Sequence, residues 1–153
     1  LINPGVQPLA ELLDNYNFSS YSLRDMVLEG NKLFINARRD YYYQRDNDLS
    51  WEEISDQLMI FDLSKLSLNR VFESPIGTYY VQLMGVYGDN LFLNLPGDGI
   101  LMLDVSNPAQ PIGLQFMRTL GWSTHMEFAG DNAYVAAGHF GIFQMNLKTN
   151  PKL

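Results

Sequence analysis

The chain has 153 residues, with 10 basic and 17 acidic side chains and a formal net charge of −7. This balance argues against nucleic acid as a partner, because phosphate neutralisation requires clustered lysine and arginine. The absence of cysteine excludes disulfide bonds, thiol catalysis and cysteine metal sites. No apolar run is as long as a membrane span, so we expect no membrane-spanning segment.

The first element we expect is a strand over residues 12–24. The preceding INPGVQPLAEL parallels SNPAQPIGLQF at Ser106 to Phe116, where one strand of a repeat has ended and another begins. The parallel indicates that residues 1–25 supply an outer strand to a preceding or closing unit.

Three later segments share one pattern around a glycine. They read MVLEGNKLFIN (26–36), MGVYGDNLFLN (84–94) and MEFAGDNAYVA (126–136). Glycine with Asn or Asp between two apolar stretches predicts a β-hairpin, because these residues accept the dihedral angles of a tight turn. Each repeat should therefore begin with two antiparallel strands.

Further strands are expected after each hairpin. Third strands should cover residues 57–64, 99–106 and 141–147, and fourth strands residues 68–76 and 112–120. The runs LMIF and ILML in two of the third strands are apolar at successive positions. Such runs are typical of strands that are buried on both faces.

The first repeat contains an insertion. The separation from Gly30 to Asp62 is 32 residues, against 16 from Gly88 to Asp104, which leaves 16 additional residues. Within it, Ser50 and Glu53 have the spacing of a helix capping box. We expect a short helical turn near residues 51–55.

Four short strands repeated about every 42 residues, the spacing of Gly88 and Gly130, indicate the blades of a β-propeller. The expected fold is all-β: a single propeller segment with four antiparallel strands per blade and about three repeats. A β-sandwich is the alternative. The units are an outer strand (1–25), a blade with an insertion at 38–55 (26–82), a second blade (83–125) and a partial blade (126–153).

The segment GILMLDVSNPAQP, followed by GDNAYVAAGHFGIFQMNL, resembles the LVIVD-repeat class of bacterial and archaeal β-propellers. This resemblance implies a propeller fold and an extracytoplasmic location: secreted, periplasmic or on the cell surface. It supplies no catalytic residue. Because three blades are fewer than the usual four to eight, the chain should contact remaining propeller blades or a second copy of itself.

The loops between second and third strands should share one rim with the connections between blades. Aromatic side chains on this rim suit a protein or glycan ligand. We expect a binding scaffold with no catalytic residue, metal or cofactor. The alternatives are part of a propeller lyase or hydrolase, a metal site at the two histidines, and a structural spacer. The candidate binding residues are Tyr41, Tyr42, Tyr43, Trp51, Tyr80, Trp122, His125 and His139.

Overall fold

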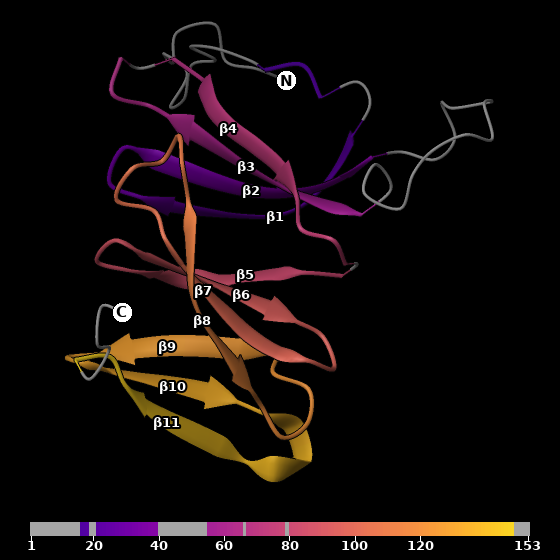
Figure 1. Cartoon of the computed structure of the whole chain (residues 1–153), viewed down its shortest axis with the longest axis vertical. Helices are drawn as coiled ribbons and strands as arrows, with labels where there is room; N and C mark the ends of the chain where they lie inside the picture. The colour runs from indigo at the N-terminus through magenta and orange to yellow at the C-terminus, as the bar shows by residue number, and fades with distance from the viewer. Residues whose placement is uncertain (1–15, 19–20, 40–54, 66, 79, 149–153) are drawn as a thin grey trace, which may run out of the picture.

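The computed structural model describes residues 16–18, 21–39, 55–65, 67–78 and 80–148. They form three antiparallel sheets that pack one on another along the long axis of the molecule (Figure 1). The first sheet contains β1 (Tyr21–Glu29), β2 (Lys32–Arg39), β3 (Asp56–Asp62) and β4 (Asn69–Pro75). The second contains β5 (Gln82–Tyr87), β6 (Asn90–Leu95), β7 (Gly99–Asp104) and β8 (Ile112–Arg118). The third contains β9 (His125–Ala129), β10 (Asn132–Ala136) and β11 (Ile142–Asn146), with a 3-10 turn, η2 (Gly138–Phe140), before β11.

The all-β prediction is confirmed for the described residues, and so is the order of the strands. Each sheet is a simple meander in which successive strands pair: β1-β2-β3-β4, β5-β6-β7-β8 and β9-β10-β11. The three predicted hairpins are present, with Gly30, Gly88 and Gly130 at φ of 56°, 59° and 57°. Glycine accepts this left-handed conformation at the first position of a two-residue hairpin turn.

The beginning of the first sheet differs from the sequence prediction. Residues 21–24, expected at the end of a separate strand over 12–24, belong to β1 and pair with β2. A β-bulge between Leu23 and Asp25 accounts for the difference, since it lets the pairing continue across one extra residue. Residues 12–15 and 19–20, and residues 51–54 of the expected helical turn, lie outside the described part of the chain.

Apolar side chains fill the space between adjacent sheets. Phe34 and Ile60 of the first sheet pack against Leu83 and Leu91 of the second. A separate cluster joins the second and third sheets. As predicted, β3 is buried on both faces: every residue from Asp56 to Phe61 is inaccessible to solvent or nearly so. The second cluster is centred on Phe92, Ile100, Met102, Met126, Ala133 and Val135.

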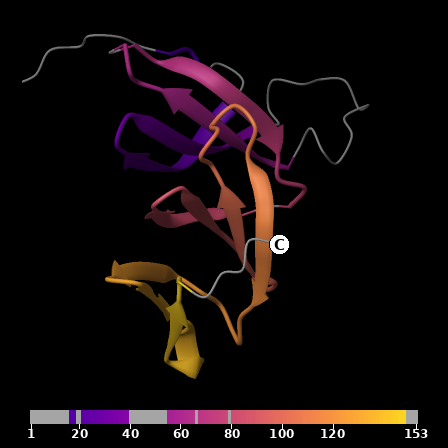
Figure 2. The same ribbon diagram turned by 60° about the vertical axis from the view of Figure 1, so that its left-hand side comes forward.

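The sheets approach one another most closely at their first strands. β5 contacts β1 on one side and β9 on the other. Figure 2 shows the three sheets as successive layers of one stack, turned with respect to one another. Each connection from one sheet to the next leads directly into one of these first strands, β5 or β9.

Candidate functional site

The loop rim is the end of the stack formed by the connections between sheets (residues 76–81 and 119–124) and by the loops at 96–98 and 137–141. Backbone hydrogen bonds tie these segments to the ends of the strands. Asp56 N donates to Thr78 O at 3.0 Å, and Ile76 N donates to Asp56 O at 2.8 Å. In the next repeat, Thr124 N donates to Ala136 O at 3.0 Å. The first connection is thus tied to β3 of the sheet before it, and the second to β10 of the sheet after it.

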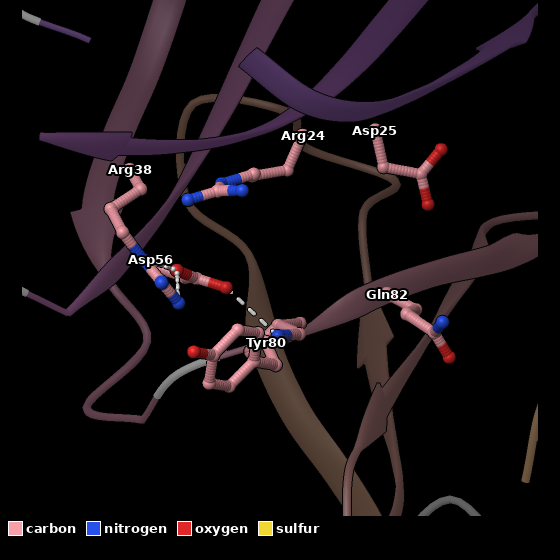
Figure 3. A pocket seen from close by; sticks show the side chains of 7 residues that line it. Arg24, Asp25, Arg38, Asp56, Tyr80 and Gln82 are labelled. Carbon is pink, nitrogen blue, oxygen red and sulfur yellow. Dashed lines mark hydrogen bonds and ion pairs between the residues drawn. The ribbon is translucent and has the colours of Figure 1, made fainter. Parts of the chain in front are cut away.

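A pocket of about 220 Å³ opens at the rim between the first and second sheets. The strands β1, β2 and β3 supply one wall, and the start of β5 with the residues before it supplies the other. Figure 3 shows the charged side chains of the first sheet facing Tyr80 and Gln82. The lining residues are Arg24, Asp25, Arg38, Asp56, Tyr80, Val81 and Gln82.

A buried carboxylate organises this pocket. Asp56 is fully buried at the start of β3 and lies opposite Arg38 of β2. Its Oδ1 accepts a hydrogen bond from Arg38 Nε at 2.8 Å, and Arg38 Nη2 lies 2.8 Å from the same oxygen. Its Oδ2 accepts bonds from Val81 N at 2.8 Å and Asn36 Nδ2 at 3.3 Å. Because a buried charge needs a partner, this network holds the first sheet to the start of the second.

Tyr80 is the aromatic residue at the mouth of the pocket. Its φ of 58° is the only positive value at a residue other than glycine in the described part of the chain. One face of the ring is covered by the Arg38 guanidinium, 4.6 Å from the ring centroid, yet the residue is 70% exposed. A tyrosine held in a left-handed conformation is strained by about 1–3 kcal/mol, and such residues cluster at functional sites.

The second junction presents a different surface. Trp122 follows Tyr80 by 42 residues in the next connection and is 72% exposed. Its neighbour Gly121 has φ of 79°, and a Cβ there would lie 2.5 Å from the Phe140 ring. The connection and η2 are therefore packed together, which brings Trp122 close to the segment that carries His139.

Neither of the two predicted histidines lines the pocket. His139 and His125 are both exposed, and His125 Nε2 lies 2.9 Å from Glu127 Oε1 on its own strand. No group of three or more His, Asp or Glu side chains suited to a metal occurs among the described residues. Tyr41, Tyr42, Tyr43 and Trp51 lie outside that part of the chain.

Sequence reasoning missed the four charged residues of the pocket. In the sequence, Arg38 belongs to a short basic cluster with Arg39 and Arg45, and aspartates lie among these arginines. The available signal was a pair of oppositely charged residues, Arg38 and Asp56, at the two ends of the insertion. Nothing in the sequence marks Arg24 and Asp25 as pocket residues, because the residue types do not predict the bulge at this point of β1.

The groups with shifted pKa values lie at the opposite end of the stack. There Asp131 accepts a hydrogen bond from Lys148, which lowers the pKa of the Asp131 carboxyl and raises that of the Lys148 amine. Burial and a hydrogen bond to Asp131 raise the pKa of the Tyr87 phenol. Hydrogen bonds from Ser64 lower the pKa of Asp62. These groups stabilise hairpins and turns away from the rim.

Comparison with known proteins adds no family assignment. A scan against family models and a search of curated proteins both find no match to this chain. In the described residues, the structure contains no helix of the length and apolar character that crossing a bilayer requires.

Proposed function

We propose that the chain is a non-enzymatic β-propeller module whose loop rim binds a protein or glycan ligand. In this proposal the three sheets are blades. The support is their repeated meander topology, their face-to-face packing and the contacts of β5 with β1 and β9. Propeller blades have the same arrangement, with first strands around a central channel.

The observation that carries the binding proposal is the equivalent placement of two exposed aromatic residues. Tyr80 and Trp122 lie 42 residues apart, each just before the first strand of a sheet. Both are more than two-thirds exposed. Exposed aromatic rings on a rigid framework offer large contact area at a small cost in conformational entropy.

The open face of the third sheet supports a contact with a further blade or with a second copy of the chain. Ile142 has the position of Ile100 in the repeat, and Tyr134 that of Phe92. Ile100 and Phe92 are fully buried against the next sheet, whereas Ile142 is 74% exposed. Light scattering of the 17.5 kDa chain tests self-association, and an Ile142→Glu variant should weaken any dimer.

The LVIVD resemblance is the support for an extracytoplasmic location. The resemblance concerns the fold, and a fold by itself does not identify an activity. The binding proposal therefore does not use this resemblance as support. A secreted or surface location would make glycans and the ectodomains of other proteins the accessible ligands. Detection of the protein in fractionated cells is the direct test.

The function is tested by ligand capture on glycan and protein arrays, with rim variants compared. A Tyr80→Ala, Trp122→Ala double variant should lose at least tenfold in affinity, since buried aromatic anchors each contribute about 2 kcal/mol or more. Phe116→Ala, which removes an exposed aromatic ring from β8, is the matched control. Deletion of residues 40–50 should also abolish capture and preserve the fold. Capture that neither change alters would reject this surface and favour a structural spacer.

A further inference from the structure

The two ends of the stack expose the two sides of a contact that occurs twice within the chain. Figure 1 shows the first sheet at one end and the third sheet at the other. Between them, the first sheet packs against the second through one apolar cluster, and the second packs against the third through another. Equivalent positions in the three sheets therefore show which side of this contact each end presents.

The outer face of the first sheet has the positions that receive a preceding sheet. In each first strand, one residue pairs with the residue five positions after the hairpin glycine: Met26, Leu83 and Met126 in chain order. Leu83 and Met126 are buried in the clusters that join their sheets to the sheet before. Met26 is 68% exposed, and Leu28, which shares its face of β1, is 60% exposed. The first sheet thus presents an apolar face that the other two sheets bury.

The outer face of the third sheet has the positions that pack on a following sheet. The residue four positions after the hairpin glycine is Phe34, Phe92 and Tyr134 in successive sheets. Phe34 and Phe92 are fully buried in the clusters shared with the next sheet, whereas Tyr134 is exposed. The third-strand residues Ile100 and Ile142 show the same contrast. This face and the outer face of the first sheet are therefore opposite sides of one kind of contact.

The first sheet also carries, on its outer face, a residue equivalent to one that lies in an internal contact. Phe18 precedes Gly30 by 12 residues, as Ile76 precedes Gly88 by 12. Ile76 follows β4 and packs on the cluster between the first and second sheets. Phe18 packs on the outer cluster of the first sheet, with its ring centroid 5.9 Å from that of Phe61. The outer face of the first sheet is thus built as the second sheet is built where it receives the first.

From this equivalence we infer that the third sheet of one copy packs on the first sheet of a second copy, head to tail. The inference rests on the propeller architecture proposed above and specifies the partner of its two open faces. Because the two faces differ, the contact is heterologous, and such contacts either close into a ring or continue into a filament. Two copies give six sheets, within the usual four to eight blades of a propeller, whereas three copies give nine. The assembly is therefore a closed pair with two identical contacts.

This contact should be weaker than the contacts between sheets within the chain. On the third sheet, Gln144 pairs with Tyr134 as Met102 pairs with Phe92 on the second, so a polar side chain replaces an apolar one. Obligate interfaces are more hydrophobic than interfaces that dissociate. We therefore expect the pair to dissociate on dilution.

The experiment is sedimentation velocity of the full chain over a wide range of concentrations. The mass of the wild type should rise from 17.5 kDa to twice that value and no further. Met26→Glu and Ile142→Glu should each weaken association by about tenfold or more, because each places an unpaired charge in both contacts. Ile112→Glu, at an exposed apolar residue of β8, is the matched control and should associate like the wild type. Because all three positions are exposed, the variants should keep the circular dichroism spectrum of the wild type.

A mixture of the two defective variants separates head-to-tail packing from a symmetric contact. The Met26→Glu copy keeps an unaltered third sheet, and the Ile142→Glu copy keeps an unaltered first sheet. One intact contact therefore forms between them, and a mixed dimer should appear at concentrations where each variant alone is monomeric. Native mass spectrometry with one variant labelled with nitrogen-15 identifies this species.

Three results would overturn the inference. Loss of the dimer by only one of the two substitutions, with no rescue in the mixture, would show a symmetric contact through that face. A monomer at every concentration would reject a second copy as the partner. Masses beyond two copies would reject the closed pair. Ligand capture by the rim is a separate measurement, so the proposed binding function would stand or fall on the array experiment alone.

Discussion

Asn36 and Asn94 make the same contact at successive junctions of the stack. Each side-chain amide donates from the second strand of its sheet to a backbone carbonyl that precedes or begins the next sheet. The distance is 2.6 Å to Val81 O in one case and 2.6 Å to Ser123 O in the other. Both asparagines are buried. Each amide therefore supplies the hydrogen bond that the carbonyl loses when folding removes it from water.

Asn94→Ala should lower the free energy of unfolding by about 1–3 kcal/mol, because it leaves the buried Ser123 carbonyl without its donor. Urea denaturation measures the change. Gln115→Ala, which removes an exposed amide from β8, should stay within about 0.5 kcal/mol of the wild type. Equal effects of the two substitutions would show that the asparagine contact does not join the sheets.

Asp56→Asn should destabilise the chain more strongly, by about 3–5 kcal/mol, because the largely buried Arg38 guanidinium loses its charged partner. The double variant Arg38→Met, Asp56→Asn should recover part of that loss, since no unpaired buried charge remains. A double-mutant cycle from urea denaturation gives the coupling between the two side chains. A coupling within error of zero would contradict the central role of this pair.

The repeat could be predicted because its signals are local. Gly30, Gly88 and Gly130 each set a hairpin with the residue that follows, and two of the third strands are recognisable as continuous apolar runs. The turn after each third strand is equally local: the side chains of Asp62, Asp104 and Asn146 accept hydrogen bonds from the backbone two residues later. Here Asn146 performs the same role as the aspartates of the other repeats.

The pocket could not be predicted because its contacts are nonlocal. Arg38 and Asp56 are separated by the insertion, and only the β2–β3 register makes them neighbours. Val81 and Tyr80 reach them from the connection to the next sheet, through packing that no sequence periodicity encodes. The assignment of residues 21–24 to the expected strand over 12–24 was wrong for a related reason, since the bulge at Arg24 extends β1 without any marker in the sequence.

Gly99 provides a test of the pairing between β7 and β8. Its φ is 146°, and a Cβ at this position would lie 2.1 Å from the carbonyl oxygen of Met117. Gly99→Ala should cost about 2–4 kcal/mol from strain and overlap combined. Gly97→Ala, at φ of 87° with no atom within 4 Å of the new Cβ, should cost only the backbone strain, about 1–2 kcal/mol. Similar melting temperatures for the two variants would refute the close approach at Gly99.

The hairpin end of the stack should make stability depend on pH through Asp131. Hydrogen bonds from Lys148 and Tyr87 lower the pKa of this carboxyl in the folded chain, so its ionised form favours folding. The contribution is present above the ordinary aspartate pKa of about 3.9, and it is lost as pH falls through the lower folded-state value. Asp131→Asn should therefore lower the melting temperature at pH 7, and the difference should shrink toward pH 3. Lys148, whose pKa is raised, contributes in the opposite window: its share is complete below about 10.4 and disappears at higher pH. A deficit that persists unchanged at pH 3 would show that Asp131 acts through its shape rather than its charge.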